Sequence, residues 1–72
     1  MTDEELDEAI LRLLHERRRE NQHDRVVATE RLTQRVEQPV ERVRERLKAM
    51  SMEDPPRVKE SGALPDRWFL PD

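Results

Sequence analysis

Residues 27–50, VATERLTQRVEQPVERVRERLKAM, contain two helical patterns separated by a proline, and this stretch decides the fold. In the first pattern Ala28, Leu32 and Val36 recur at four-residue steps, which puts them on one face of a helix. We expect this helix to begin near Thr29, whose side chain can act as an N-cap. Pro39 cannot continue a helix interior, so the helix that begins near Thr29 ends before it.

The second pattern covers about residues 40–50. Its apolar residues are spaced by three, four and three positions, which predicts one buried helical stripe. These residues are Val40, Val43, Leu47 and Met50. The sequence therefore predicts two short amphipathic helices joined by residues 37–39.

A further helix is predicted at the N-terminal side. Thr2 and Glu5 have the spacing of a capping box, and the basic run 17–19 suits the other end of the helix. The predicted buried stripe consists of Leu6, Ala9, Ile10 and Leu13, with Leu14 at its flank. Leu11 points away from this stripe, which is typical of an isolated exposed residue or of a contact with a partner.

Two short strands are predicted after Pro55 and Pro56. They cover residues 57–60 and 67–70, and the turn-rich stretch between them holds the only glycine. Trp68 and Leu70 share the face that we expect to pack on the core, while Val26 and Val27 favour a short strand earlier in the chain. The predicted fold is mainly α with a small β-hairpin (α+β), in one domain over residues 1–72.

The composition argues against catalysis and favours association. A chain of 72 residues buries only about 60% of its unfolded surface, and without cysteine it has no disulfide to stabilise it, so we expect a homodimer or a partner. His15 and His23 do not have metal-ligand spacing, and one glycine cannot form a phosphate loop, so we expect no metal, no cofactor and no enzyme activity. The apolar runs are too short to cross a bilayer and there is no signal core, so we expect a cytoplasmic protein.

Positive charge is concentrated in one segment of an otherwise acidic chain. The net charge is −3, yet residues 38–50 carry four bases against two acids. Arginine supplies nearly all the basic residues, and the acid excess is typical of a halophilic source. A cationic helix in an acidic protein is where a DNA-reading helix is expected.

The two helices at residues 27–36 and 40–50, followed by the hairpin at residues 57–70, resemble the winged helix-turn-helix family of DNA-binding regulators. Leu32 and Val36 match the core positions of the family's second helix, and Trp68 matches an aromatic residue that the family often carries in its last strand. The chain is similar to short phage-repressor-like regulators of halophilic archaea and their viruses. In the turn, Glu37 departs from the family's usual small residue.

The resemblance implies a sequence-specific regulator of transcription, of the repressor type, that binds double-stranded DNA as a homodimer. The residues expected in the major groove are Glu41, Arg42, Arg44, Glu45 and Lys48. Wing contacts are expected from Arg57, Lys59 and Arg67, and backbone contacts from Arg31 and Arg35.

Two other interpretations remain open. The helix at residues 40–50 can present only a solvated face, on which Glu41–Arg44, Arg42–Glu45 and Glu45–Lys48 form ion pairs. The chain can also be a protein–protein interaction module without DNA binding, which docks through its acidic N-terminal helix. The acids of that helix are Asp3, Glu4, Glu5, Asp7 and Glu8.

Overall fold

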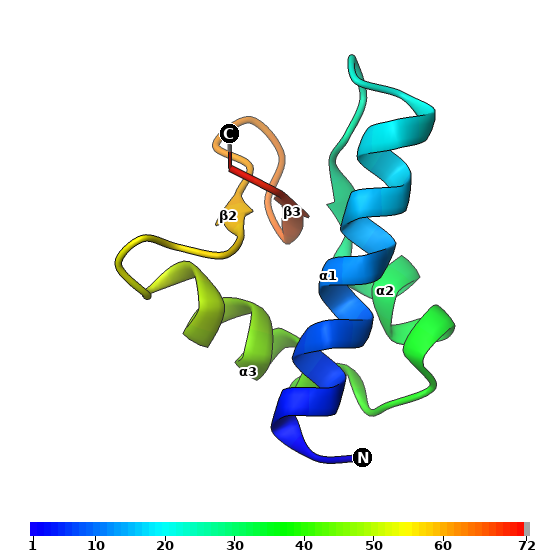
Figure 1. Ribbon diagram of the computed structural model, residues 1–72, viewed down its shortest axis with the longest axis vertical. Helices are drawn as coiled ribbons and strands as arrows, with labels where there is room; N and C mark the ends of the chain where they lie inside the picture. The colour runs from blue at the N-terminus through cyan, green and yellow to red at the C-terminus, as the bar shows by residue number, and fades with distance from the viewer. Residues whose placement is uncertain (72) are drawn as a thin grey trace.

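The computed structural model describes residues 1–71 and consists of three helices and a small antiparallel sheet (Figure 1). The elements are α1 (Asp3–Glu20), β1 (Val27–Ala28), α2 (Thr29–Val36), α3 (Val40–Ser51), β2 (Lys59–Glu60) and β3 (Arg67–Phe69). The predicted α+β class, with helices in the majority, is confirmed. No helix in this part of the chain is both long and apolar enough to cross a membrane.

Helix α1 begins with the predicted capping box. The Thr2 backbone N–H donates to the Glu5 carboxylate at 3.0 Å, and the Glu5 backbone N–H donates to the Thr2 hydroxyl at 3.1 Å. The bond from the Thr2 backbone lowers the pKa of Glu5. Acids in the first turn and arginines in the last turn both complement the helix dipole.

The connection between α2 and α3 is as short as predicted, but its caps differ from the expectation. Thr29 is the first helical residue and not the N-cap, a position that Ala28 occupies without a side-chain bond. The reason is that the Thr29 hydroxyl is engaged by the last strand. Glu37 adopts the left-handed conformation, with φ of 56°, and its N–H donates to the Thr33 carbonyl at 3.0 Å.

The sheet has three strands in the order β1-β3-β2, so the short strand favoured at Val26 and Val27 is present as Val27–Ala28 and joins the predicted hairpin. Val27 lies opposite Trp68, and Glu60 lies opposite Trp68 on the other side, so β3 is the central strand. The strand predicted at residues 57–60 begins only at Lys59, because the Arg57 N–H is directed away from the sheet, to the Met50 carbonyl.

The core lies between the three helices and the sheet. Its buried residues are Leu6, Ile10, Leu14, Val27, Leu32, Val36, Val43, Leu47, Met50, Val58, Trp68 and Leu70. Val40, predicted for the same stripe, and Ala28 are only half-buried.

The buried arc of α1 is shifted from its predicted position. Leu14 is fully buried, while Ala9 and Leu13 are only partly buried, and Leu11 packs against the core instead of pointing away from it. The shift arises because α3 packs against the side of α1 that carries Asp7 and Leu14.

Candidate nucleic-acid interface

The outer face of α3 is open to solvent. Val43, Leu47 and Met50 anchor the helix in the core, so the residues on the opposite side point outward. Glu41, Glu45 and Lys48 are exposed there, in the orientation that the sequence predicts. This face carries two carboxylates and one ammonium group.

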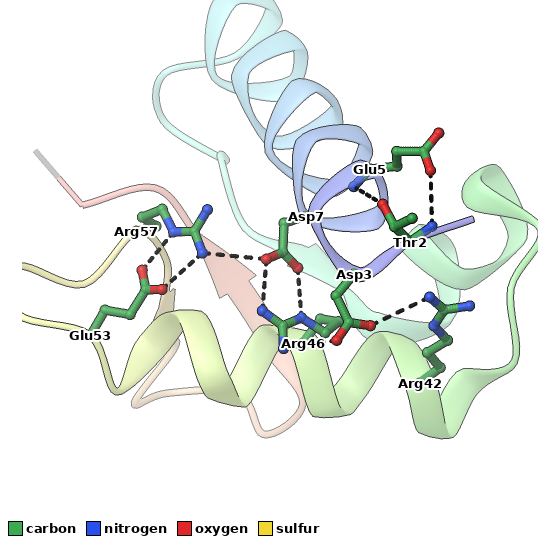
Figure 2. A network of polar contacts seen from close by, with 8 residues as sticks. All are labelled: Thr2, Asp3, Glu5, Asp7, Arg42, Arg46, Glu53 and Arg57. Atoms are coloured by element: carbon green, nitrogen blue, oxygen red, sulfur yellow. Dashed lines mark hydrogen bonds and ion pairs between the residues drawn. The ribbon is translucent and has the colours of Figure 1, made fainter.

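Arg42 is held toward the start of α1. Its guanidinium donates to the Met1 carbonyl and to the Gln38 side chain at 3.2 Å. It also donates to Asp3 at 3.4 Å (Figure 2). These contacts lie on the α1 side of α3. Arg42 is therefore engaged within the chain by the first turn of α1, and its expected contact in the major groove stays a prediction.

Arg44 lies at the edge of the outward face and is paired with the loop before β3. It contacts Asp66 in a two-pronged arrangement, with N–O distances of 3.3 and 2.8 Å. The hydrogen bond to Asp66 raises the pKa of Arg44, and the same bond holds the pKa of Asp66 below its ordinary value. Such bidentate pairing fixes the position of the guanidinium plane.

Asp66 also joins α2 to this contact. The Thr29 hydroxyl donates to the Asp66 carboxylate at 2.8 Å and accepts from the Trp68 indole N–H at 2.6 Å. A continuous chain of hydrogen bonds thus runs from the buried Trp68 to Arg44 on α3.

Arg46 forms the most enclosed ion pair of the molecule's described part. The Nε and Nη2 atoms of Arg46 each lie 2.8 Å from an oxygen of the Asp7 carboxylate, whose side chain is 4% exposed (Figure 2). The hydrogen bonds to Asp7 raise the pKa of Arg46. Asp7 therefore belongs to the interior and is not available as an acidic docking residue, contrary to the expectation for the first helix.

Arg57 completes this network instead of extending the wing. It contacts Glu53 at 2.5 and 2.8 Å and Asp7 at 3.3 Å. The pairing with Glu53 raises the pKa of Arg57, and the bond to Arg57 lowers the pKa of Glu53. The guanidinium of Arg57 is thus turned toward α1, and the wing contact expected from it stays a prediction.

The other predicted bases lie outside the outer face of α3. Lys59 and Arg67 are exposed on β2 and β3. Arg31 and Arg35 are exposed on α2, where they line hollows shared with α1. The structure therefore brings Glu41, Glu45, Lys48 and Arg44 together but does not bring Arg31 and Arg35 to that face.

The ion pairs predicted within α3 for its arginines do not form. The arginines of α3 pair instead with carboxylates outside the helix. Sequence reasoning missed Asp7, Arg46 and Asp66. A signal existed for Asp7: Ile10, Leu11 and Leu14 follow it at three, four and seven positions, so it lies within an apolar arc.

Among the described residues, no group of His, Cys, Asp or Glu side chains is arranged to hold a metal ion. The chain matches no protein-family model, no curated protein and no solved structure.

Proposed function

We propose that the chain is a winged helix-turn-helix domain that binds double-stranded DNA with sequence specificity and regulates transcription, as a repressor. One observation carries this proposal: the outer face of α3 is exposed on the second of two helices joined by three residues. A helix presented in this way can enter a major groove. The three-stranded sheet places a hairpin beside it.

The exposed side chains have suitable chemistry for reading base edges. A glutamate can accept from the cytosine amino group, and Lys48 can donate to guanine. Lys59 and Arg67, exposed on the hairpin, can contact flanking phosphates. Arg44 enters the site from its edge, already positioned by Asp66.

The small number of free bases implies weak non-specific binding. Each phosphate that is neutralised releases counterions and contributes to affinity, and Glu41 and Glu45 oppose this. A homodimer doubles the number of contacts, so we propose that the operator has two half-sites.

The same charges favour a second candidate, a protein–protein interaction module without DNA binding. Arg42, Arg44 and Arg46 are all engaged by carboxylates of the chain itself. Because Asp3 and Asp7 are engaged too, the acidic surface left for such a partner is formed by Glu4 and Glu8.

The test is a mobility-shift titration with duplexes that cover the DNA around the chain's own coding region. The variant is Lys48→Glu, which reverses an exposed charge on α3, and the matched control is Arg12→Glu on the distant face of α1. We expect Lys48→Glu to weaken binding at least about tenfold and to lower the salt slope by about one, with no change for the control.

Equal binding by the Lys48→Glu protein and the wild type would remove α3 from the mechanism. Failure of the wild type to retain any duplex, together with stoichiometric purification of a protein bound through Glu4 and Glu8, would establish the second candidate instead.

A further inference from the structure

The free arginines of the molecule gather away from α3. Arg12, Arg31, Arg35 and Arg67 are exposed, and none of them has a carboxylate partner within the described residues. Arg12 belongs to α1, Arg31 and Arg35 to α2, and Arg67 to β3. All four line hollows along the α1–α2 junction.

These three hollows adjoin one another and together are called the trough. The hollow beside Met1 shares Leu13 and Arg35 with the central hollow, and the central hollow shares Arg17 and Arg31 with the hollow beside Leu64. Along α1 the trough follows the helix from Ala9 to Glu20, a length of about 16 Å. α1 and α2 run side by side there (Figure 1). α3 contributes no residue to the lining that the structure describes.

The floor of the trough is apolar. It consists of Ala9, Leu13, Val27, Leu32 and Val36, of which Ala9 and Leu13 are only partly buried. Both ends are marked by large apolar side chains open to solvent, Met1 at 55% exposure and Leu64 at 51%. A rim of cations around an apolar strip is typical of a surface that binds a partner.

The rim identifies the chemistry of that partner. Its free cations attract acidic groups, and the apolar floor requires side chains that a phosphate backbone does not have. Glu16 and Glu20 also lie on the rim, where the four free arginines outnumber them. A second copy of the chain fits less well, because the apolar stripe of its acidic helix is buried in its own core.

We propose that the trough is the docking site for an acidic amphipathic helix of another protein. Apolar side chains of that helix fill the floor between Met1 and Leu64, and its carboxylates pair with Arg12, Arg31 and Arg35. The lining of the site contains no residue of α3, and it shares Leu64 and Arg67 with the hairpin.

The test uses isothermal titration of the whole chain with a synthetic helical peptide of about 15 residues. Its leucines recur at positions i, i+4 and i+7, and its other positions hold glutamates separated by alanines, so that like charges do not unfold the helix. Two control peptides carry lysine in place of glutamate, or serine in place of leucine. The variants are Arg31→Glu with Arg35→Glu, and Leu64→Ser, all at exposed positions, and Lys48→Glu on α3 is the matched control.

We expect the acidic leucine peptide to bind and both control peptides to fail. The double arginine variant loses at least about tenfold in affinity, Leu64→Ser loses several-fold, and Lys48→Glu binds as the wild type does. Binding of the lysine peptide, or equal affinity for the double arginine variant, overturns the proposal. Loss of duplex DNA binding in the double arginine variant assigns the trough to phosphate and also overturns it, whereas Lys48→Glu tests the α3 function by itself.

Discussion

Replacing Asp7 by asparagine removes the central charge of the network that joins α1 to α3. Arg46 donates two bonds of 2.8 Å to this carboxylate and Arg57 donates one of 3.3 Å. Breaking a buried ion pair from one side costs about 3–5 kcal/mol, because the remaining charge is left without its partner. Asparagine keeps one acceptor, and the Arg46 side chain is 20% exposed, so we expect a loss of about 2–3 kcal/mol.

This loss is large for the size of the chain. A domain of 72 residues has a free energy of unfolding of about 4–11 kcal/mol. The expected decrease corresponds to a fall in Tm of roughly 10–20 °C. Urea unfolding followed by far-UV circular dichroism measures the change in free energy, and a thermal scan gives the Tm.

The matched control is Asp3→Asn, which removes a carboxylate from the same network at 63% exposure. Its contacts of 3.4 and 3.7 Å are those of a surface pair, so we expect a loss below about 0.5 kcal/mol. A loss for Asp7→Asn as small as that of the control would refute the reasoning. Asp7→Leu combined with Arg46→Met should recover most of the stability, because apolar residues can replace a buried pair.

Three further predictions concern the connections around α2. Glu37→Gly should stabilise the chain by about 1 kcal/mol, since φ of 56° strains any residue with a Cβ, and a destabilised variant in urea unfolding would contradict this. Thr29→Val should cost about 1–3 kcal/mol in the same assay, because it leaves the Trp68 indole N–H buried without an acceptor, and a neutral variant would show that water replaces the hydroxyl. The lowered pKa of Asp66 means that its contribution is complete above its ordinary value of 3.8 and is lost as the pH falls through the folded value. The stability gap between wild type and Asp66→Asn should therefore shrink as the pH falls below 3.8, and a constant gap would rule out the ionised pair with Arg44.

The helices could be predicted from the sequence because local patterns specify them. The capping box at Thr2 and Glu5 and the apolar spacing of Val43, Leu47 and Met50 are statements about near neighbours, and both are confirmed. The position of the proline likewise predicted where α2 ends. Each of these features is determined within one or two helical turns.

The pairing of the short first strand and the ion pairs could not be predicted in this way. β1 exists because Val27 meets Trp68, a residue far along the chain, and two β-branched residues by themselves do not indicate a partner. Arg44 and Arg46 look alike in the sequence, one on each flank of the helix. Only the packing of α1 and of the loop before β3 decides that one pairs with Asp7 and the other with Asp66.

The orientation of the outer face of α3 was predictable, whereas its electrostatics were not. The apolar stripe determined that Glu41, Glu45 and Lys48 point outward. The net positive charge of residues 38–50 suggested a cationic surface, but three of its four bases are neutralised by carboxylates from α1 and from the loop before β3.

The hydrogen-bonded chain from Trp68 to Arg44 gives the protein a built-in optical reporter. Trp68 is the only tryptophan, so ultraviolet emission at long excitation wavelength comes from this one indole ring. Its N–H is bonded to Thr29, which is bonded to the carboxylate that holds the α3 guanidinium. A ligand that draws Arg44 away from Asp66 will therefore change the wavelength or intensity of that emission. Ligand binding at the edge of α3 can thus be followed without attaching a dye.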